Sequence, residues 1–370
     1  MKFIKQKHLL AKREATNAFR CLKTLEEVKT DFCSNDYIGL SKEGENFNDV
    51  KTKGSGGSRL LAGNYSEIED LESYLATFHK VETALVFNSG YNANVGFFSS
   101  VPQKGDTVFY DELIHASIKD GMRLSFANSY SFKHNNLDDL EKKLNRAEGD
   151  IYIVVEAVYS MDGDFSPLND LVLLANKTNA CLIVDEAHSI GVFGDHGEGI
   201  VQELGLQDKI PVRIVTFGKA IGAHGAAILS NKLIKNFLIN FSRSFIYTTA
   251  LPPYSILSIK SSYFEMSKGF RTKKLRSKIK HFKKEVSKNN KLTVIESDSS
   301  IQCVIIPGNK EVKLYSSFLN TCGFDVRAVM SPTVSKGVER LRICLHVFNT
   351  NEEITELVKL LESENILCGN

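Results

Sequence analysis

Lys219 is the residue whose type and setting best suit covalent chemistry. It follows Gly218 in the segment 215–220, VTFGKA, where an apolar run ends in Thr216. A lysine that forms a Schiff base must be held at a fixed point with its amine partly deprotonated, and a strand end beside a glycine turn provides such a point. The ordinary alternative is a surface lysine in a turn, so this motif needs support from elsewhere in the chain.

A second apolar run ends in a carboxylate. Residues 182–188 read LIVDEAH, so Asp185 stands at the end of a predicted buried strand and His188 follows three residues later. A buried aspartate that pairs with a pyridine nitrogen keeps the ring protonated, and the ring can then accept electrons from a carbanion. His188 could hydrogen-bond a ring oxygen or the aspartate. The structural alternative is that Asp185 caps a helix.

Residues 185–188 also spell DEAH, a sequence of some helicases. An ATPase of that kind needs a phosphate loop of the form GxxxxGK(S/T) upstream. The Gly218–Lys219 pair instead lies downstream, has Arg213 in place of the first glycine and is followed by Ala220. The sequence therefore does not predict a helicase.

Two glycine-containing segments could bring backbone close to a ligand. Residues 54–59, GSGGSR, lack the third glycine and the preceding strand of a dinucleotide fingerprint, so we expect them to approach a ligand or a partner subunit. Residues 88–92, NSGYN, lie between a predicted strand and a predicted helix. Because free backbone N–H groups at a helix start bind phosphate, Gly90 and Tyr91 are the predicted phosphate site.

His115 lies near another predicted strand end. Its imidazole could stack on a planar pyridine ring, although a lone histidine is more often a satisfied core or surface residue. The nine histidines show no spacing such as HExxH, and the sequence contains no GxSxG elbow. The sequence therefore predicts neither a metal enzyme nor a serine hydrolase.

These residues need a scaffold that brings distant segments together, and the pattern from 83 to 230 predicts one. Short apolar runs alternate with helix-like segments at 137–144 and 168–178. The runs, read as strands, lie at 84–87, 107–110, 151–156, 182–185, 213–216 and 225–229. This alternation is typical of a mostly parallel sheet covered on both faces, which binds ligands at the carboxyl ends of its strands. Five strand ends carry polar residues, including Ser160, so we expect one shared pocket.

The predicted fold class is α/β with a second, smaller α+β domain. Residues 1–50 are predicted to form an N-terminal arm, 51–250 the large domain and 251–370 the small domain. In the last, helical patterns run from about 253 to 290, strands are expected at 292–296, 302–306 and 339–345, and a closing helix begins at Glu352.

Composition limits the class of protein. Charged residues make up 24% of the 370 residues and the net charge is +2, which is typical of an ordinary soluble protein and not of a nucleic-acid binder. The N-terminus lacks the apolar core of a signal peptide, and no run reaches the roughly 18–20 apolar residues that span a membrane. The seven cysteines are scattered without a CxxC pair, so a reducing cytoplasm is expected.

Taken in order, the motifs resemble those of the α-oxoamine synthases, a family of fold-type I transferases that use pyridoxal 5'-phosphate (PLP). The resemblance runs nearly from end to end. It is carried by SNDYIGL at 34–40, GSGGSRLLAG at 54–63, SGY at 89–91, HAS at 115–117, Glu156 with SMDGD at 160–164, DEAH at 185–188, TFGK at 216–219, and IYTT at 246–249 with PP at 252–253. It implies a mostly parallel seven-stranded sheet in the large domain.

The resemblance also implies roles for single residues. The catalytic set is Lys219, which would carry the cofactor, Asp185 at the pyridine nitrogen, His115 stacked on the ring, and His188. The cofactor-binding set is Gly90, Tyr91, His115, Ser160, Asp185, His188, Thr216 and Lys219, with Thr248 or Thr249 supplied by the second subunit of a homodimer. The substrate-binding set is Arg20, Asn35, His115, Thr333 and Arg342. The planar guanidinium of Arg342 could grip an amino-acid carboxylate bidentately.

The implied reaction is a decarboxylative condensation of an amino acid with an acyl-CoA. Lys219 would remove the α-proton, the carbanion would attack the thioester, and CoA and CO2 would leave. The most similar subgroup joins L-alanine to a pimeloyl group, carried by CoA or by a carrier protein, in biotin biosynthesis. The alternatives are a glycine C-acetyltransferase, a serine palmitoyltransferase-like enzyme and, more distantly, an inactive relative that only binds ligands.

Overall fold

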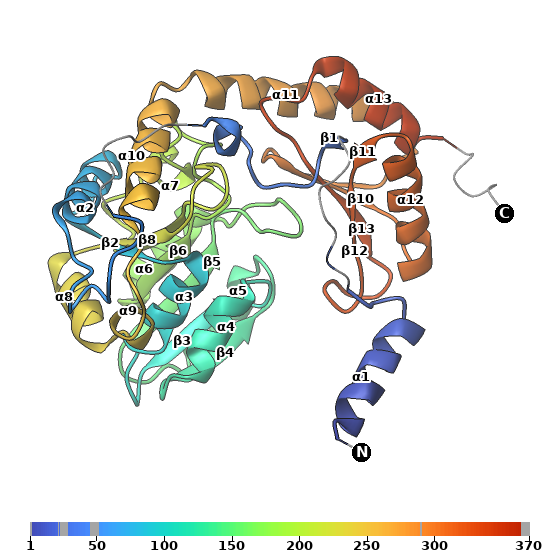
Figure 1. Cartoon of the computed structure of the whole chain (residues 1–370). Coiled ribbons are helices and arrows are strands. Elements are labelled where there is room, and N and C mark those ends of the chain that lie inside the picture. Colours follow the sequence, from blue (N-terminus) through green and yellow to red (C-terminus); the bar gives the residue numbers. More distant parts are fainter. Residues whose placement is uncertain (1, 21, 23–28, 45–51, 289–290, 364–370) are drawn as a thin grey trace. The chain divides into compact units, whose positions relative to one another are not determined.

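The structure is a computed structural model that describes residues 2–20, 22, 29–44, 52–288 and 291–363. The chain forms two compact units (Figure 1). The large unit comprises Asn35–Ser160 and Phe165–Lys274, and the small unit comprises Met1–Ser34, Met161–Asp164 and Leu275–Asn370. These units are defined by packing alone, and the domain boundaries predicted at residues 50 and 250 stay a prediction.

A seven-stranded sheet forms the centre of the large unit. Its strands are β2 (Thr83–Phe87), β3 (Thr107–Asp111), β4 (Asn128–Phe132), β5 (Ile151–Glu156), β6 (Cys181–Asp185), β7 (Val212–Thr216) and β8 (Ala226–Ser230), in the order β2-β8-β7-β6-β5-β3-β4. The pairs from β4 to β7 are parallel, whereas β8 runs antiparallel to both β7 and β2. The mostly parallel seven-stranded sheet that the sequence predicted is confirmed.

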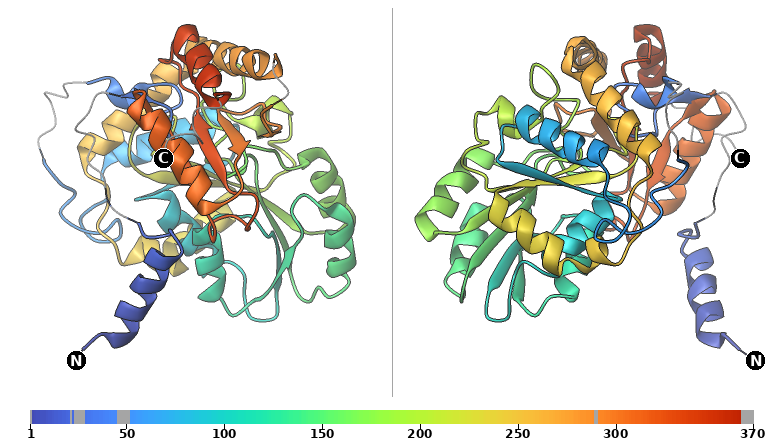
Figure 2. Two further views of the ribbon diagram at one scale, coloured as in Figure 1. Left: turned by 90° about the vertical axis from the view of Figure 1, so that its right-hand side faces the viewer. Right: turned by 60° about the vertical axis from the view of Figure 1, so that its left-hand side comes forward.

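Helices cover both faces of this sheet (Figure 2). They are α2 (Ser66–Phe78), α3 (Gly90–Phe98), α4 (Ala116–Arg123), α5 (Leu137–Leu144), α6 (Leu168–Thr178), α7 (Ile200–Glu203), α8 (Lys232–Phe241), α9 (Arg243–Ile246) and α10 (Pro253–Ser267). Because side chains alternate along a strand, neighbouring residues enter different cores. Val154 of β5 packs with Phe97 of α3 and Ile118 of α4, while Val155 packs with Leu171 of α6. Strands buried on both faces explain the continuous apolar runs of the sequence.

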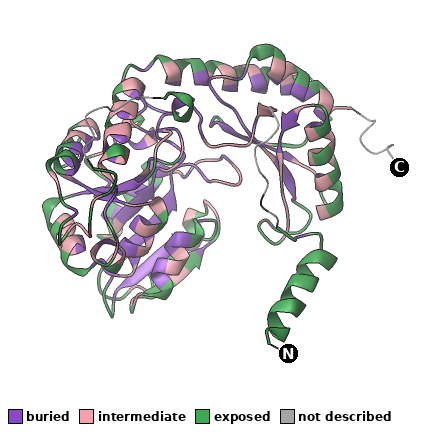
Figure 3. Cartoon of the chain, in the orientation of Figure 1, coloured by how far each residue is buried: buried purple, intermediate pink, exposed green. Residues whose placement is uncertain are grey.

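The predicted strands of the large unit all occur, and each end lies within one residue of its predicted position. The helices predicted at 137–144 and 168–178 also match α5 and α6. The sequence missed β4, which pairs only with β3 at the edge of the sheet. Its residues read NSYSF, and only Phe132 is buried, so an edge strand of this kind lacks the apolar run that marks the others. Figure 3 shows how burial is distributed over the described residues of the chain.

The small unit is built around a four-stranded antiparallel sheet of order β12-β13-β10-β9. These strands are β9 (Val294–Ile295), β10 (Ile301–Ile305), β12 (Arg327–Val329) and β13 (Arg340–Cys344), and α12 (Asn309–Thr321) and α13 (Asn351–Leu361) accompany them. The strands predicted at 292–296, 302–306 and 339–345 and the closing helix are confirmed; α12 and β12 were not predicted. A capping box of Thr350 and Glu353 fixes the start of α13.

Two further elements tie the N-terminal segment to the small unit. β1 (Thr30–Asp31) pairs in parallel with β11 (Phe324–Asp325). α1 (Ile4–Ala15) has no buried residue, and just beyond its C-terminal end Asn309 Nδ2 donates to the backbone oxygen of Thr16 at 3.0 Å. The helical pattern predicted from 253 to 290 is resolved into α10 and the lysine-rich α11 (Phe270–Ser287). Among the described residues, no helix combines the length and apolar character needed to cross a membrane.

Candidate active site

A cavity of about 150 Å³ lies at the carboxyl ends of the parallel strands in the large unit. We call it the strand-end cavity. It is lined by Gly90, Tyr91, Asn94, His115, Ser117, Glu156, Asp185, Ala187, His188, Ile214, Thr216 and Lys219. The lining residues come from the segments that follow β2 and β3 and from the ends of β5, β6 and β7, as the strand-end argument predicted. The predicted residues that it brings together are Gly90, Tyr91, His115, Asp185, His188, Thr216 and Lys219.

Asp185 is 5% exposed and is held on two sides. Its Oδ1 accepts the N–H of Ala187 at 2.9 Å, and its Oδ2 accepts from Nδ2 of Asn94 on α3 at 3.1 Å. Turns follow Asp185, and the next helix, α7, begins only at Ile200. The alternative interpretation of Asp185 as a helix cap is therefore wrong. These two hydrogen bonds hold the carboxyl group in one orientation in the cavity wall.

Lys219 ends a chain of hydrogen bonds that starts outside the cavity. Its Nζ lies 2.7 Å from Nε2 of His188, and Nδ1 of His188 lies 2.7 Å from the hydroxyl of Tyr37. That hydroxyl donates to Oδ1 of Asn35 at 3.1 Å. The hydroxyl of Tyr37 donates its proton to Asn35 and can therefore only accept from His188. All three hydrogen bonds form when His188 carries its proton on Nδ1 and accepts from Lys219 through Nε2. Asn35, predicted to bind substrate, thus acts on the cavity through Tyr37.

His115 presents a largely neutral ring to the cavity. It caps α4, where its Nδ1 accepts the N–H of Ser117 at 3.2 Å. Burial lowers the pKa of His115 below the usual value for histidine; the neighbouring Asp185 opposes this shift and Lys219 adds to it. A neutral ring can pack against a planar ligand without adding a second positive charge beside Lys219.

The start of α3 provides the predicted phosphate site. Ser89 caps this nine-residue helix by accepting the N–H of Asn92 at 3.1 Å, which leaves the N–H groups of Gly90 and Tyr91 without a partner inside the helix. A β-carbon on Gly90 would lie 3.5 Å from Oγ1 of Thr216, so backbone and hydroxyl lie close together. Helix N–H groups beside a hydroxyl suit an anion.

The cavity also contains polar atoms that the described residues do not satisfy. Oδ1 of Asn94 and Oε1 of Glu156 are buried without a hydrogen-bond partner. A buried polar group without a partner costs about 1–3 kcal/mol, so these atoms indicate a bound polar molecule. PLP fits the residues present, since an amine, a carboxylate, a neutral ring and an anion site all face one space.

Four predicted residues of the large unit lie outside the cavity lining. Asn35 is linked to the cavity through Tyr37, and the backbone N–H of Ser160 favours the ionised form of Glu156. Thr248 and Thr249 lie beside Asn88, whose Nδ2 donates to Oγ1 of Thr248 at 3.3 Å and to the backbone oxygen of Thr249 at 2.6 Å. Their predicted action from a second subunit stays a prediction.

The other predicted substrate residues, Arg20, Thr333 and Arg342, belong to the small unit. Nη2 of Arg20 donates to Oγ1 of Thr333 at 3.2 Å, which brings together two positions more than 300 residues apart in sequence. Arg342 lies on β13, where its Nη1 contacts Sγ of Cys344 at 2.9 Å. The structure therefore joins Arg20 to Thr333 and places Arg342 on a rigid strand.

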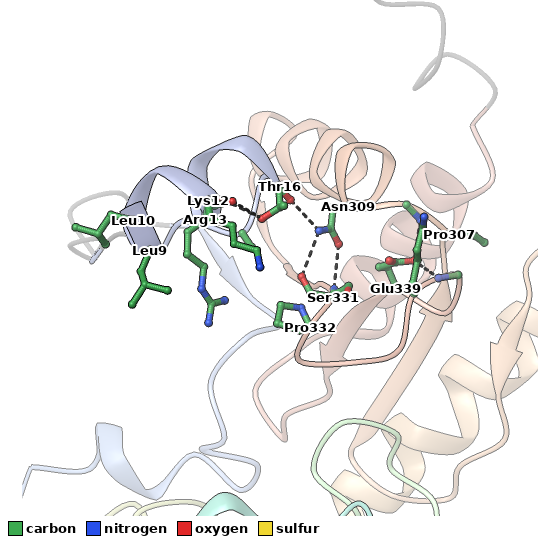
Figure 4. Close-up of a pocket in the computed structure, with 14 residues that line it drawn as sticks. Leu9, Leu10, Lys12, Arg13, Thr16, Pro307, Asn309, Ser331, Pro332 and Glu339 are labelled. Atoms are coloured by element: carbon green, nitrogen blue, oxygen red, sulfur yellow. Dashed lines mark hydrogen bonds between the residues drawn. The ribbon is translucent and has the colours of Figure 1, made fainter. Parts of the chain in front are cut away.

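A larger cavity of about 1080 Å³ lies within the small unit, and its wall includes Pro332, the residue before Thr333 in the chain (Figure 4). Its walls are Leu9, Leu10, Lys12, Arg13, Thr16, Ala18, Pro307, Gly308, Asn309, Ser331, Pro332, Lys336, Gly337 and Glu339. Three of these side chains are cationic. The one acidic side chain in this wall, Glu339, accepts hydrogen bonds from the N–H groups of Gly308 and Gly337. This cavity therefore suits a long ligand with both apolar and anionic parts.

Sequence reasoning missed three lining residues as functional candidates: Asn94, Ser117 and Glu156. Asn94 was detectable, because it is a polar residue within the otherwise apolar segment ANVGFF of α3. Its amide also donates to Oγ of Ser117 at 3.0 Å, which links the wall from α3 to α4. Glu156 was noticed only as part of a family motif, and its buried state carries no signal in the sequence.

The comparisons with known proteins agree with this geometry. Residues 27–361 match the family described as aminotransferase class I and II. The 8-amino-7-oxononanoate synthase of Emericella nidulans is 40% identical, with 95% of this chain and 93% of that protein covered. A serine palmitoyltransferase variant from S. paucimobilis, solved with PLP and myriocin bound, has a TM-score of 0.88 at 26% identity and covers 98% and 97% of the two chains. The 8-amino-7-oxononanoate synthase of Francisella tularensis has a TM-score of 0.75 at 28% identity, covering 90% and 96%.

The sheet topology, together with a lysine and a carboxylate at neighbouring strand ends, defines an enzyme of the fold-type I class. The chain belongs to the class I and II aminotransferase family and, within it, to the α-oxoamine synthases. The resemblance that the sequence motifs indicated is thereby confirmed.

Lys219→Ala should prevent covalent attachment of PLP and abolish turnover, because no other lysine among the described residues lines the strand-end cavity. Borohydride reduction of the PLP-treated protein, followed by peptide mass spectrometry, should find the cofactor on Lys219 in the unmodified chain. Lys177→Ala, at an exposed lysine paired with Glu141, is the control and should label normally. Circular dichroism checks that both variants fold. Steady-state condensation by Lys219→Ala would contradict the assignment.

Proposed function

We propose that this enzyme is an 8-amino-7-oxononanoate synthase that condenses L-alanine with a pimeloyl thioester in biotin biosynthesis, with PLP as its cofactor. The observation that carries the reaction class is the presence of Lys219 and Asp185 in the wall of one cavity. The choice of substrates is supported by a relative of that name that is 40% identical over nearly the whole of both chains.

The residues of the strand-end cavity would have separate roles in the reaction. PLP, when bound, supplies an electron sink for charge at the substrate α-carbon. Asp185, oriented by Asn94, would hold a proton at the pyridine nitrogen. Nζ of Lys219 would take the α-proton and return it, and Nε2 of His188 keeps that amine in place from 2.7 Å. The groups that would hold and move protons, Asp185 and Lys219, are thus in place before substrate binds.

The small unit would bind the ends of the two substrates. We assign the amino-acid carboxylate to Arg342, whose planar guanidinium can donate two parallel hydrogen bonds. The acyl donor would use the Arg20–Thr333 pair and the larger cavity, in which apolar Leu9 and Leu10 accompany Lys12 and Arg13. A thioester of CoA has this combination of an apolar acyl chain and phosphate groups.

We further propose a homodimer that acts in the cytoplasm. In a single chain Thr248 and Thr249 lie beside Asn88 and outside the cavity lining, which is consistent with a role at the phosphate site of a second subunit. Light scattering of the purified chain tests this assembly. The five cysteines that the structure describes are all free, which supports a reducing compartment, and cell fractionation tests the location.

A serine palmitoyltransferase-like activity is the second candidate. It is favoured by one observation, the TM-score of 0.88 to the S. paucimobilis enzyme against 0.75 to the F. tularensis synthase. Sequence identity is similar in the two comparisons, at 26% and 28%, and does not decide between them.

A substrate panel should separate these candidates. Alanine, glycine and serine are each offered with pimeloyl-, acetyl- and palmitoyl-CoA to the PLP-loaded protein, and CoA release is measured. We expect turnover with alanine and pimeloyl-CoA. Preference for serine with palmitoyl-CoA, or for glycine with acetyl-CoA, would keep the mechanism and contradict the proposed substrates.

Arg342→Gln should raise the KM for alanine by about 10- to 100-fold, because charge-assisted hydrogen bonds contribute about 1.5–3 kcal/mol. Arg342→Lys should fall between this variant and the unmodified enzyme, since a lysine keeps the charge but not the planar fork. Arg327→Lys is the matched control. Arg327 is the register partner of Arg342 on the neighbouring strand β12, and its Nη2 lies 2.9 Å from the carboxylate of Asp325. An alanine KM unchanged in Arg342→Gln would rule out the assigned role.

A further inference from the structure

Glu156 is a second carboxyl group in the strand-end cavity, and the proposed mechanism does not use it. It is the last residue of β5 and is in register with Asp185, the last residue of the neighbouring parallel strand β6. Side chains of paired residues in parallel strands lie on the same side of the sheet. The two carboxyl groups therefore face the same space.

The surroundings of these two carboxyl groups differ. Asp185 receives hydrogen bonds on both oxygens, from Ala187 and Asn94. Glu156 is only 3% exposed, and its Oε1 has no partner among the described residues. Glu156 lines the cavity, so its carboxyl group lies beside any molecule bound there.

Charge decides which form Glu156 adopts. The charged or titratable groups around it are Asp185 on β6, Lys219 after β7, His115 at the start of α4, His188 and Tyr159. Burial, and after it the charge of Asp185, raises the pKa of Glu156 to about 8; Lys219 and the backbone N–H groups of His115 and Ser160 oppose the shift. Two neighbouring buried carboxyl groups do not both ionise readily, and the one with an oxygen that lacks a donor keeps its proton.

We propose that Glu156 is a neutral carboxylic acid that donates a hydrogen bond to an anionic oxygen of the molecule bound in the strand-end cavity. This rests on the proposed cofactor and substrates. The oxygen belongs either to PLP or to the carboxylate of the amino acid, and the chemistry of recognition is the same for both. Asp185 then provides the fixed anion of the site and Glu156 the fixed proton donor.

Glu156→Gln tests this assignment, because an amide keeps a donor of the same shape but cannot ionise. At pH 7 its dissociation constants for PLP and for L-alanine should lie within about threefold of the unmodified enzyme. Glu156→Leu, which has no donor, should weaken at least one of them about tenfold or more. Circular dichroism and thermal unfolding check that both variants fold.

The pH dependence gives a readout that does not require turnover. Between pH 7 and 9 the neutral fraction of an acid with a pKa of about 8 falls about tenfold, so affinity that depends on this form should fall about tenfold over that range. The loss should be absent from Glu156→Gln. Glu72→Gln is the matched control: Glu72 is equally buried at 3% but is paired with Arg59 and Lys235. Its pH profile should follow that of the unmodified enzyme, because Glu156 is still present.

The outcomes separate this assignment from the proposed function. If Glu156→Gln removes the pH dependence of PLP binding, the acceptor of the hydrogen bond is an oxygen of the cofactor. If it removes the pH dependence of alanine binding, the acceptor is the substrate carboxylate. Profiles that superimpose for Glu156→Gln and the unmodified enzyme in both measurements would overturn the assignment. So would a Gln variant as weak as the Leu variant at pH 7. If the substrate panel shows no turnover with alanine and pimeloyl-CoA but the pH dependence of binding is still lost in Glu156→Gln, only the proposed substrates are contradicted.

Discussion

The geometry of the site depends on a buried ion pair that lies on the other side of the sheet. Glu186 follows Asp185 and, by the alternation of side chains, points to the opposite face, where Nη1 of Arg213 lies 3.4 Å from its carboxylate with both side chains fully buried. Burial raises the pKa of Glu186 and lowers that of Arg213, and each charge opposes the shift of the other. Breaking such a pair costs about 3–5 kcal/mol. Glu186 also accepts from Ser189 at 2.9 Å and from the N–H of Val201 at 3.1 Å, which fixes the turn that carries His188.

The same alternation explains why residues far apart in sequence meet in one cavity. Val154 and Glu156 on β5, Ile183 and Asp185 on β6, and Ile214 and Thr216 on β7 are spaced by two. The first member of each pair packs in the core beneath α3 and α4, and the second ends the strand at the cavity wall. A parallel arrangement is needed for this, because it places all three carboxyl ends at one edge. Packing and function therefore use the same face of the same strands.

This regularity also sets how much could be predicted from the sequence. Buried parallel strands carry continuous apolar runs, so β5 and β6 and the polar residues at their ends were predicted closely. The exposed edge strand β4 carries no such run and was missed. Lys219, Asp185 and His115 could be placed near one pocket because Asp185 ends β6 and the other two follow the ends of β7 and β3 within four residues. Asn94 and Tyr37 could not be assigned, because their roles depend on contacts with Asp185 and His188 that bridge 91 and 151 residues.

The two carboxyl groups at the ends of β5 and β6 show that residue type alone does not determine chemistry. Asp185 and Glu156 share a register position, a face and a cavity, yet one has donors on both oxygens and the other keeps an unpartnered oxygen. The donors of Asp185 come from its own turn and from Asn94 on α3. Moving the single amide of Asn94 toward Glu156 would favour the opposite distribution of charge. A helix that contributes no charge of its own thus supplies one of the two donors that distinguish Asp185 from Glu156.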